Sequence, residues 1–199
     1  MRISLILAHP HPGSFNHALA AAAAGELRGR GHEVLFHDLC AEGFDPLLPA
    51  GEIPAGALPG SAVAEHCREI AAADGIVVVH PNWWGMPPAI LKGWVDRVLR
   101  PGVAYRFDED GGGRPVGLLK ARIAVVINTS DTTPRRERET FGDPLETIWR
   151  NCIFGFCGVH RFHRRTFGVV CVSTADQRAT WLTEARQLVG EVFGVRGEA

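Results

Sequence analysis

Two adjacent tryptophans, Trp83 and Trp84, stand in a turn-like segment between Pro81 and Gly85, directly after an apolar run at residues 75–79. Indole rings stack on planar ligand rings or meet them edge-on. The loops after the strands of an open parallel sheet are where such folds bind ligands. The alternative is that both rings fill a gap in the core or a subunit contact. We interpret the segment as one wall of a site for a planar ligand.

A second candidate segment is the loop at residues 9–14, which precedes an Ala-rich stretch that begins at Phe15. Ser14 is the predicted N-cap of a helix there. The unpaired N–H groups and the dipole at a helix N-terminus attract anions such as phosphate, and Gly13 would let a ligand approach the backbone closely. The loop lacks a Walker lysine and the three glycines of a Rossmann fingerprint. A phosphate site and a simply capped helix both remain open.

The third candidate segment, residues 128–133, is rich in hydroxyl groups and follows a predicted strand. It could hydrogen-bond the polar edge of a heterocycle, or it could be an ordinary turn. Each of the three signals is weak alone. They follow the first, third and fourth predicted strands, so together they predict a phosphate and an aromatic ring bound at one edge of a sheet.

The elements that must position these loops alternate along the chain. Strands are predicted at residues 2–8, 33–39, 75–79, 122–128 and 169–173, and helices at 15–29, 61–73, 88–99, 143–154 and 175–195. Residues 41–60 and 101–120, the latter with glycines 111–113 at its tip, are predicted loops, and the charged run 135–139 is a predicted solvated face. Alternating strands and helices predict a three-layer, doubly wound α/β fold with a five-stranded parallel sheet. Five strands fit the flavodoxin-like order 2-1-3-4-5 in a single domain, 1–199.

Composition limits the class of protein. Apolar residues make up 46% of the 199 residues and the formal net charge is −1, so we expect no nucleic-acid partner and no membrane surface. The N-terminal stretch shows no signal-cleavage pattern, and no segment could span a bilayer, which together predict a cytoplasmic protein.

Thiols and imidazoles form no metal or disulfide pattern. The five cysteines include no CxxC pair, and Cys157 and Cys171 are predicted to be core thiols and not nucleophiles. The closest histidine pairs, at 9/11 and 160/163, lack the companion ligands that a zinc site needs. No metal site is predicted.

The segments above resemble the NAD(P)H:quinone oxidoreductases, the DT-diaphorase-like branch of the flavodoxin-like flavoproteins. The most specific segment is Pro-Ala-Ile-Leu-Lys-Gly-Trp at residues 88–94. The similar segments occur in the same order over nearly the whole chain, at 8–9, 14–16, 80–81, 88–94, 96–98, 104–105 and 156–158.

In that family the first loop holds the flavin phosphate, the second lies along the isoalloxazine ring, and the third contacts its polar edge. The resemblance therefore implies a flavin site made of His9, Ser14, Phe15, Asn16, Ala18, Pro81, Asn82, Trp83, Trp84, Gly85, Thr129, Ser130, Asp131 and Thr132. The family uses FMN and FAD. The short chain without a recognisable adenosine-binding tail favours FMN, with FAD as the alternative. NAD(P)H is the implied electron donor.

The sequence departs from the family pattern in two places. Relatives often have Thr-Thr-Gly-Gly where this chain has residues 129–132, and some have a Tyr and a His that stabilise the charged flavin. Phe141 falls at the position of that His, and Tyr105 is the only tyrosine of the chain. No catalytic side chain is therefore implied, because the flavin carries the hydride chemistry and backbone N–H groups could support its negative charge.

The family is usually dimeric. The resemblance implies a homodimer in which Tyr105 and Phe107 close the substrate pocket of the partner, with Phe141 also in that pocket. On the helix at 88–99 a wide apolar stripe fits burial against both a sheet and a twin subunit, and consists of Ile90, Leu91, Trp94, Val95, Val98 and Leu99. An ordinary sheet-covering helix is the alternative.

The leading hypothesis is a flavin-dependent NAD(P)H:quinone oxidoreductase that transfers two electrons in a ping-pong reaction to a quinone or a related electrophilic acceptor. A flavin-binding regulatory subunit, for example of a potassium-efflux system, is the alternative. A one-electron carrier is a third hypothesis, but such carriers are strongly acidic and the net charge here is −1.

Overall fold

Five parallel strands form the centre of the molecule. The computed structural model describes residues 1–54, 56–108 and 113–194. The strands are paired in the order β2-β1-β3-β6-β7, and their bounds are β1 Arg2–Leu7, β2 Glu33–Asp38, β3 Gly75–Pro81, β6 Ile123–Ser130 and β7 Arg161–Gly168. This is a flavodoxin-like α/β fold.

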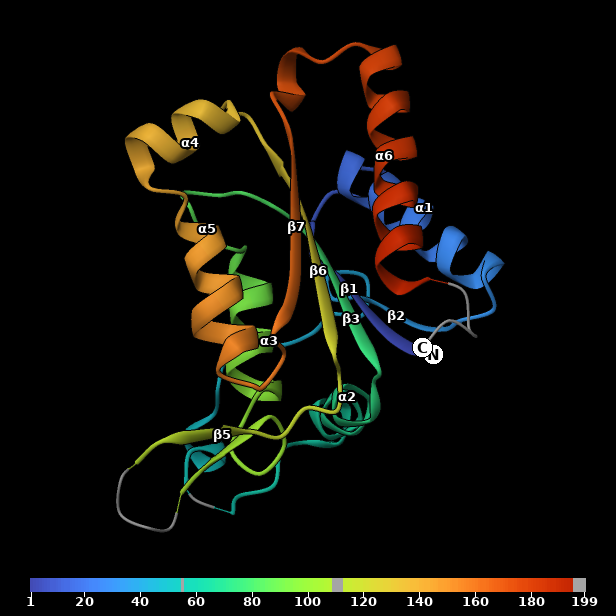
Figure 1. Cartoon of the computed structure of the whole chain (residues 1–199). Helices are drawn as coiled ribbons and strands as arrows, with labels where there is room; N and C mark the ends of the chain where they lie inside the picture. Colours follow the sequence, from blue (N-terminus) through green and yellow to red (C-terminus); the bar gives the residue numbers. More distant parts are fainter. Residues whose placement is uncertain (55, 109–112, 195–199) are drawn as a thin grey trace.

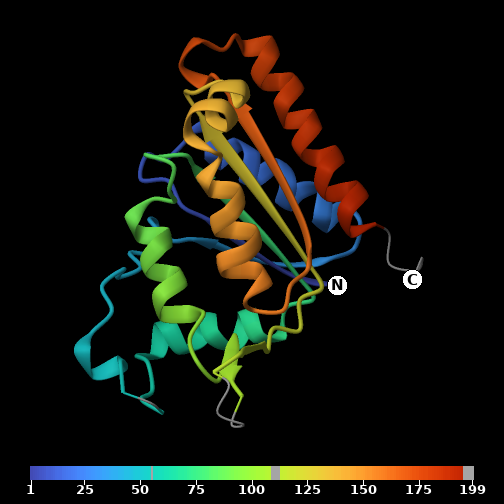
Figure 2. The same ribbon diagram turned by 60° about the vertical axis from the view of Figure 1, so that its left-hand side comes forward.

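Helices cover both faces of this sheet (Figure 1). One layer contains α1 (Phe15–Gly29) and α6 (Ala175–Phe193), and the other contains α2 (Ser61–Ala72), α3 (Ala89–Val98) and the segment from α5 (Pro144–Thr147) through the π-helical η2 (Ile148–Gly155). The rotated view in Figure 2 separates the two layers. No helix of the described residues is long and apolar enough to cross a membrane.

The core is divided by the sheet into two apolar clusters. Along β3, Ile76 and Val78 face the cluster under α2, α3 and η2, whereas Val77 and Val79 face the cluster under α1 and α6. A strand buried on both faces is expected to be a continuous apolar run. This is why residues 75–79 could be identified as a strand from sequence.

The prediction for the fifth strand was wrong. Residues 170–172, inside the predicted strand 169–173, form a short 3₁₀ turn, η3 (Val170–Val172), and β7 precedes it. β7 is an edge strand of sequence Arg-Phe-His-Arg-Arg-Thr-Phe-Gly. Its charged side chains are paired with groups far away in sequence, for example Arg164 with Asp143, so no apolar run marked the strand.

The predicted order 2-1-3-4-5 is matched only loosely. Two short strands, β4 (Tyr105–Phe107) and β5 (Pro115–Gly117), pair with each other in a separate antiparallel hairpin and not in the main sheet. They lie in the predicted loop 101–120, and residues 109–112, with two of the predicted tip glycines, lie outside the described part. Three-residue strands are too short for a periodic signal.

The helical predictions need smaller corrections. The charged run 135–139 lies inside α4 (Pro134–Phe141), which was not predicted, and the predicted loop 41–60 contains a 3₁₀ turn, η1 (Ala50–Glu52). The predicted end of the last helix, residue 195, lies outside the described residues. β3 and β6 both extend beyond their predicted ends, to Pro81 and Ser130.

Candidate functional site

A cavity of about 560 Å³ lies at the carboxyl ends of the central strands. This is within the usual volume range of cofactor and small-molecule sites. The residues that line it come from the three predicted loop regions, from the α4–α5 region and from η3, namely His9, Phe15, Asn16, Pro81, Asn82, Trp83, Trp84, Gly85, Thr129, Ser130, Asp131, Thr132, Glu137, Phe141, Pro144 and Val170. Topology explains the convergence, because β1, β3 and β6 are neighbours and parallel.

Hydrogen bonds hold the three loops together. The Asn16 side chain donates from Nδ2 to Thr129 Oγ1 at 2.9 Å, and the Asn82 N–H donates to the Thr129 carbonyl at 2.7 Å. Asn16 is buried, and its Oδ1 has no hydrogen-bond partner. An unsatisfied buried acceptor is costly. A ligand with an N–H or O–H donor, such as the ribityl chain or the ring of a flavin, would satisfy it, so the residues present fit that group.

Trp84 occupies a strained turn at the mouth of the cavity. The N–H groups and carbonyls of Trp83 and Met86 pair at 3.1 and 3.0 Å, and the two residues between them, Trp84 and Gly85, have φ values of 57° and 72°. Positive φ at both central positions is the type I′ pattern, which favours Asn-Gly. A side chain other than that of Asn or Asp costs about 1 kcal/mol or more there relative to Gly.

The same turn is rigid. Asn82 Oδ1 accepts from the Gly85 N–H at 3.0 Å, and a Cβ at Gly85 would lie 2.7 Å from Pro144 Cγ. Trp84 is 97% exposed, so the interpretation as a core residue does not apply to it. Strain at a rigidly held, exposed aromatic residue favours a binding role.

Two helix N-termini point toward the cavity. Ser14 caps α1, as predicted, by accepting from the His17 N–H at 3.4 Å, and Thr133 caps α4 by accepting from the Arg136 N–H at 3.3 Å. Helix N-termini stabilise negative charge. His9 lies near both α1 and the tryptophan turn, with its ring centroid 6.2 Å from that of His17 and 6.0 Å from that of Trp83. Burial lowers its pKa, and the His11 N–H donates to its Nδ1 at 3.1 Å.

Four predicted site residues do not line the cavity. Ser14 Oγ is already engaged by His17, with Nδ1 at 2.8 Å, and Ala18 lies in a separate shallow depression along α1. Tyr105 and Phe107 lie in the β4–β5 hairpin, beside the amino end of β6 and away from α4 (Figure 1). There they pack on each other and on Phe156, with ring centroids 5.5 and 4.8 Å from Tyr105.

Glu137 lines the cavity and sequence reasoning missed it. The charged run was predicted to be a solvated face, but Glu137 is buried. It shares a helix face with Phe141, four residues later, and both line the cavity. That spacing was the available signal, but without the observed α4 it could not be used.

The thiols differ from the prediction at one position. Cys157 is buried, which raises its pKa to about 11, but Cys171 is exposed and its backbone N–H donates to Asp131 Oδ1 at 2.8 Å. Cys171 is therefore not a core thiol. It lies in η3, where an apolar sequence had been mistaken for a buried strand.

One group of potential metal ligands exists in the described part of the chain. The nearest atoms of His37, Glu42 and His66 lie within 4.8 Å of one another. The Trp94 indole donates to His66 Nδ1 at 3.2 Å. In a neutral ring this puts the proton on Nε2, the atom that faces Glu42, and a protonated nitrogen cannot bind a metal. The contacts describe a hydrogen-bonded polar cluster.

The fold and the cavity define a flavodoxin-like α/β protein with a ligand site at the carboxyl edge of its sheet. Residues 1–189 match the sequence profile of the Flavodoxin_2 family, described as Flavodoxin-like fold. The chain belongs to this family and, within it, to the NAD(P)H:quinone oxidoreductases.

Three relatives illustrate the relationship. An uncharacterized NAD(P)H oxidoreductase of Haemophilus influenzae is 34% identical over 92% of this chain and 91% of its own length. NAD(P)H dehydrogenase [quinone] 1 of Rattus norvegicus is 30% identical over 79% of this chain, but only 65% of the rat protein is covered. The solved NAD(P)H:quinone oxidoreductase from Methanothermobacter marburgensis has a TM-score of 0.86 and 25% identity, and the match covers 98% of each chain.

Proposed function

We propose that the chain is a flavin-dependent NAD(P)H:quinone oxidoreductase. The observation that carries the proposal is the cavity in which the three loops converge, with Asn16, whose buried Oδ1 has no partner, among its lining residues. When bound there, the flavin would accept a hydride from NAD(P)H and pass two electrons to a quinone or a related acceptor. We propose FMN as this flavin, with FAD as the alternative.

The residues of the chain would bind the flavin and orient it and the substrates. Asn16 offers its Oδ1 to a donor of the cofactor, and the backbone of residues 81–85 packs along the ring. The N-termini of α1 and α4 favour negative charge on the phosphate and on the reduced ring. Trp84 and Phe141 lie at the open side, where flat apolar rings suit a nicotinamide or a quinone. None of these side chains is required as a nucleophile.

We also propose a homodimer. Within one chain, Tyr105 and Phe107 are remote from the cavity, so they can act as pocket residues only through a partner subunit. Several large apolar side chains are exposed in the described structure, and Leu58, Trp84, Met86 and Phe107 are among them. Burial of such residues in a twin subunit would be favourable.

Two measurements on purified protein test the function. Heating releases a bound flavin, and its mass distinguishes FMN from FAD. Steady-state oxidation of NADH and NADPH with a quinone then measures turnover. A colourless protein that binds neither FMN nor FAD would refute the proposal, and a flavin-bound protein with negligible turnover would favour a regulatory subunit.

A further inference from the structure

Three hydrogen bonds form a directed chain behind the cavity. Arg164 on β7 donates from Nε to Asn128 Oδ1 at 2.8 Å, and Asn128 Nδ2 lies 2.8 Å from His80 Nε2. His80 Nδ1 in turn lies 2.8 Å from the Pro81 carbonyl oxygen. Each N–H donates toward the cavity, and bonds aligned in this way strengthen one another.

The surroundings of His80 permit one protonation state. The ring is fully buried, and the Trp149 indole donates to Nε2 at 2.9 Å, next to the Asn128 amide. Two N–H donors at Nε2 require its lone pair, so the proton of the neutral ring must be on Nδ1. Burial lowers the pKa of His80 to about 4, in agreement with a neutral ring.

The hydrogen-bond chain ends at the peptide unit between Pro81 and Asn82. His80 donates to the Pro81 carbonyl of this unit, and the Asn82 N–H of the same unit donates to the Thr129 carbonyl at 2.7 Å. Both polar groups of the peptide are thus held by the protein. The orientation of this peptide plane, whose two residues line the cavity, therefore depends on His80.

Arg164 also holds the opposite wall. Its Nη1 donates to Asp143 Oδ2 at 3.0 Å and to Glu146 Oε2 at 3.1 Å, at the start of α5. Pro144 follows Asp143 and would meet any Cβ added at Gly85, so the Asp143 contact fixes the support of the tryptophan turn. A buried ion cluster is weak evidence for stability, because apolar residues often serve equally well. Positioning is the better explanation.

We propose that Arg164, Asn128 and His80 are positioning residues that hold the Pro81–Asn82 peptide plane against which a flavin ring packs. This inference rests on the proposed function. It assigns these residues no contact with the ring, and it attributes their effect to the orientation of that peptide.

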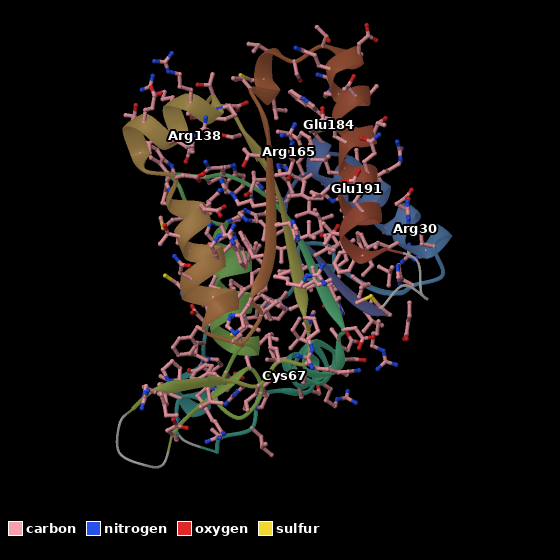
Figure 3. All side chains as sticks on the ribbon, in the orientation of Figure 1. Arg30, Cys67, Arg138, Arg165, Glu184 and Glu191 are labelled. Carbon is pink, nitrogen blue, oxygen red and sulfur yellow. The ribbon has the colours of Figure 1, made fainter. Side chains whose placement is uncertain are left out.

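The decisive variants are neighbours on one strand. Arg165 points to the other face of the sheet, where it pairs with Glu184 of α6 (Figure 3). Arg164→Ala should raise the dissociation constants of FMN and riboflavin by the same factor, roughly tenfold or more. The reason is that the variant disturbs the packing of the Pro81–Asn82 peptide on the ring, which both flavins have, and not the phosphate site, which only FMN uses. Arg165→Ala should change both by less than about twofold.

Added guanidinium ion should restore flavin affinity to Arg164→Ala, because the ion can occupy the vacated site between Asn128 and Asp143, and it should have no such effect on the Arg165→Ala control. Equal effects of the two variants on flavin binding, or no restoration by guanidinium, would overturn the inference.

A second variant keeps the test valid if Arg164→Ala does not fold. Asn128→Asp preserves the shape and the bond to Arg164 but presents an acceptor to His80 Nε2. Nitrogen-15 NMR of the flavin-free protein should show the proton on Nδ1 in the parent. The variant should bind riboflavin more weakly, because a carboxylate acceptor replaces the amide donor that holds His80 Nε2. A parent ring protonated on Nε2, or unchanged riboflavin affinity in the variant, contradicts the inference. If the parent binds no flavin, the proposed function fails, while the NMR result still decides whether the hydrogen-bond chain exists.

Discussion

Aromatic residues are exposed at two regions of the molecule, the carboxyl edge of the main sheet and the β4–β5 hairpin, and the two groups differ in kind. At the carboxyl edge, Trp84 stands almost fully exposed in a strained turn beside a cavity. In the β4–β5 hairpin, Tyr105 and Phe107 are packed against Phe156 and do not line that cavity. Strain and an unsatisfied buried oxygen at the first region indicate a ligand site. The second region shows mutual packing and has no part in the cavity of its own chain.

The largest expected effect is at Asn16. Asn16→Ala removes both the bond to Thr129 and the unpartnered Oδ1, so we expect the dissociation constant of FMN to rise roughly 10- to 100-fold. A fluorescence titration with FMN measures it. Asn151→Ala, at an exposed position of η2, is the matched control. If the two variants bind FMN equally well, Asn16 does not contribute to flavin binding, and the case for a flavin site at the carboxyl edge fails.

Trp84 should show opposite effects on stability and activity. Trp84→Asn places the preferred Asn-Gly pair in the type I′ turn, so we expect the free energy of unfolding in urea to rise by about 1 kcal/mol. We expect kcat/KM for a quinone to fall roughly tenfold, because a flat apolar wall is lost. Lower stability together with unchanged kcat/KM would show that the indole serves only packing.

Buried histidines should make stability depend on pH. Burial lowers the pKa values of both His80 and His66 to about 4 from the usual histidine value of 6.5. Below pH 6.5 the unfolded chain binds protons that the folded chain does not, so stability is full above that pH and is lost as the pH falls toward 4. Each ring should contribute up to about 1.4 kcal/mol per pH unit to the slope.

Urea unfolding between pH 4 and 7 measures this slope. His80→Gln and His66→Gln should each reduce it, since glutamine does not titrate. Only the His80 variant should also change flavin affinity, because His80 is hydrogen-bonded to Pro81, which lines the cavity, whereas His66 is hydrogen-bonded to Trp94, which does not. If stability depends on pH as steeply in both variants as in the parent, His80 and His66 are not the source of the pH dependence.

The smallest expected effect is in the hairpin. Phe107 is half-exposed, so Phe107→Ala should change the free energy of unfolding by about 1 kcal/mol or less and leave FMN affinity within about twofold. If the proposed dimer forms, kcat/KM should fall severalfold at protein concentrations where the dimer is populated and not below them. A change in FMN affinity as large as that of Asn16→Ala would remove the difference between the two regions.

Sequence patterns predicted most of the fold, and the exceptions have physical causes. The β3 strand and the α1 N-cap at Ser14 follow from local signals, namely an apolar run and a capping hydroxyl. The β7 strand does not, because Arg164 and Arg165 are paired with Glu146 of α5 and Glu184 of α6, which only the folded chain brings near. Val170 to Val172 was mistaken for a strand because apolar composition alone does not require burial.

Only part of the candidate site could be predicted from the sequence. The three loops could be found because each follows a recognisable strand, and the family resemblance connected them to a flavin. The hydrogen-bond chain from Arg164 to Pro81 could not, since it spans residues 80, 128 and 164 and depends on the orientation of one amide. Glu137 was missed because its run of charges resembles an ordinary solvated helix face.

The central claim is that the cavity at the carboxyl edge binds a flavin through the three loops. The most direct measurement is a titration of the purified, flavin-free chain with FMN and FAD, followed by flavin fluorescence and by tryptophan emission, to which Trp83 and Trp84 of the cavity wall contribute. We expect saturable binding of one flavin per chain, with quenching of both signals and strong loss of affinity in Asn16→Ala. Failure of both flavins to bind, or binding that Asn16→Ala leaves unchanged, would contradict the account.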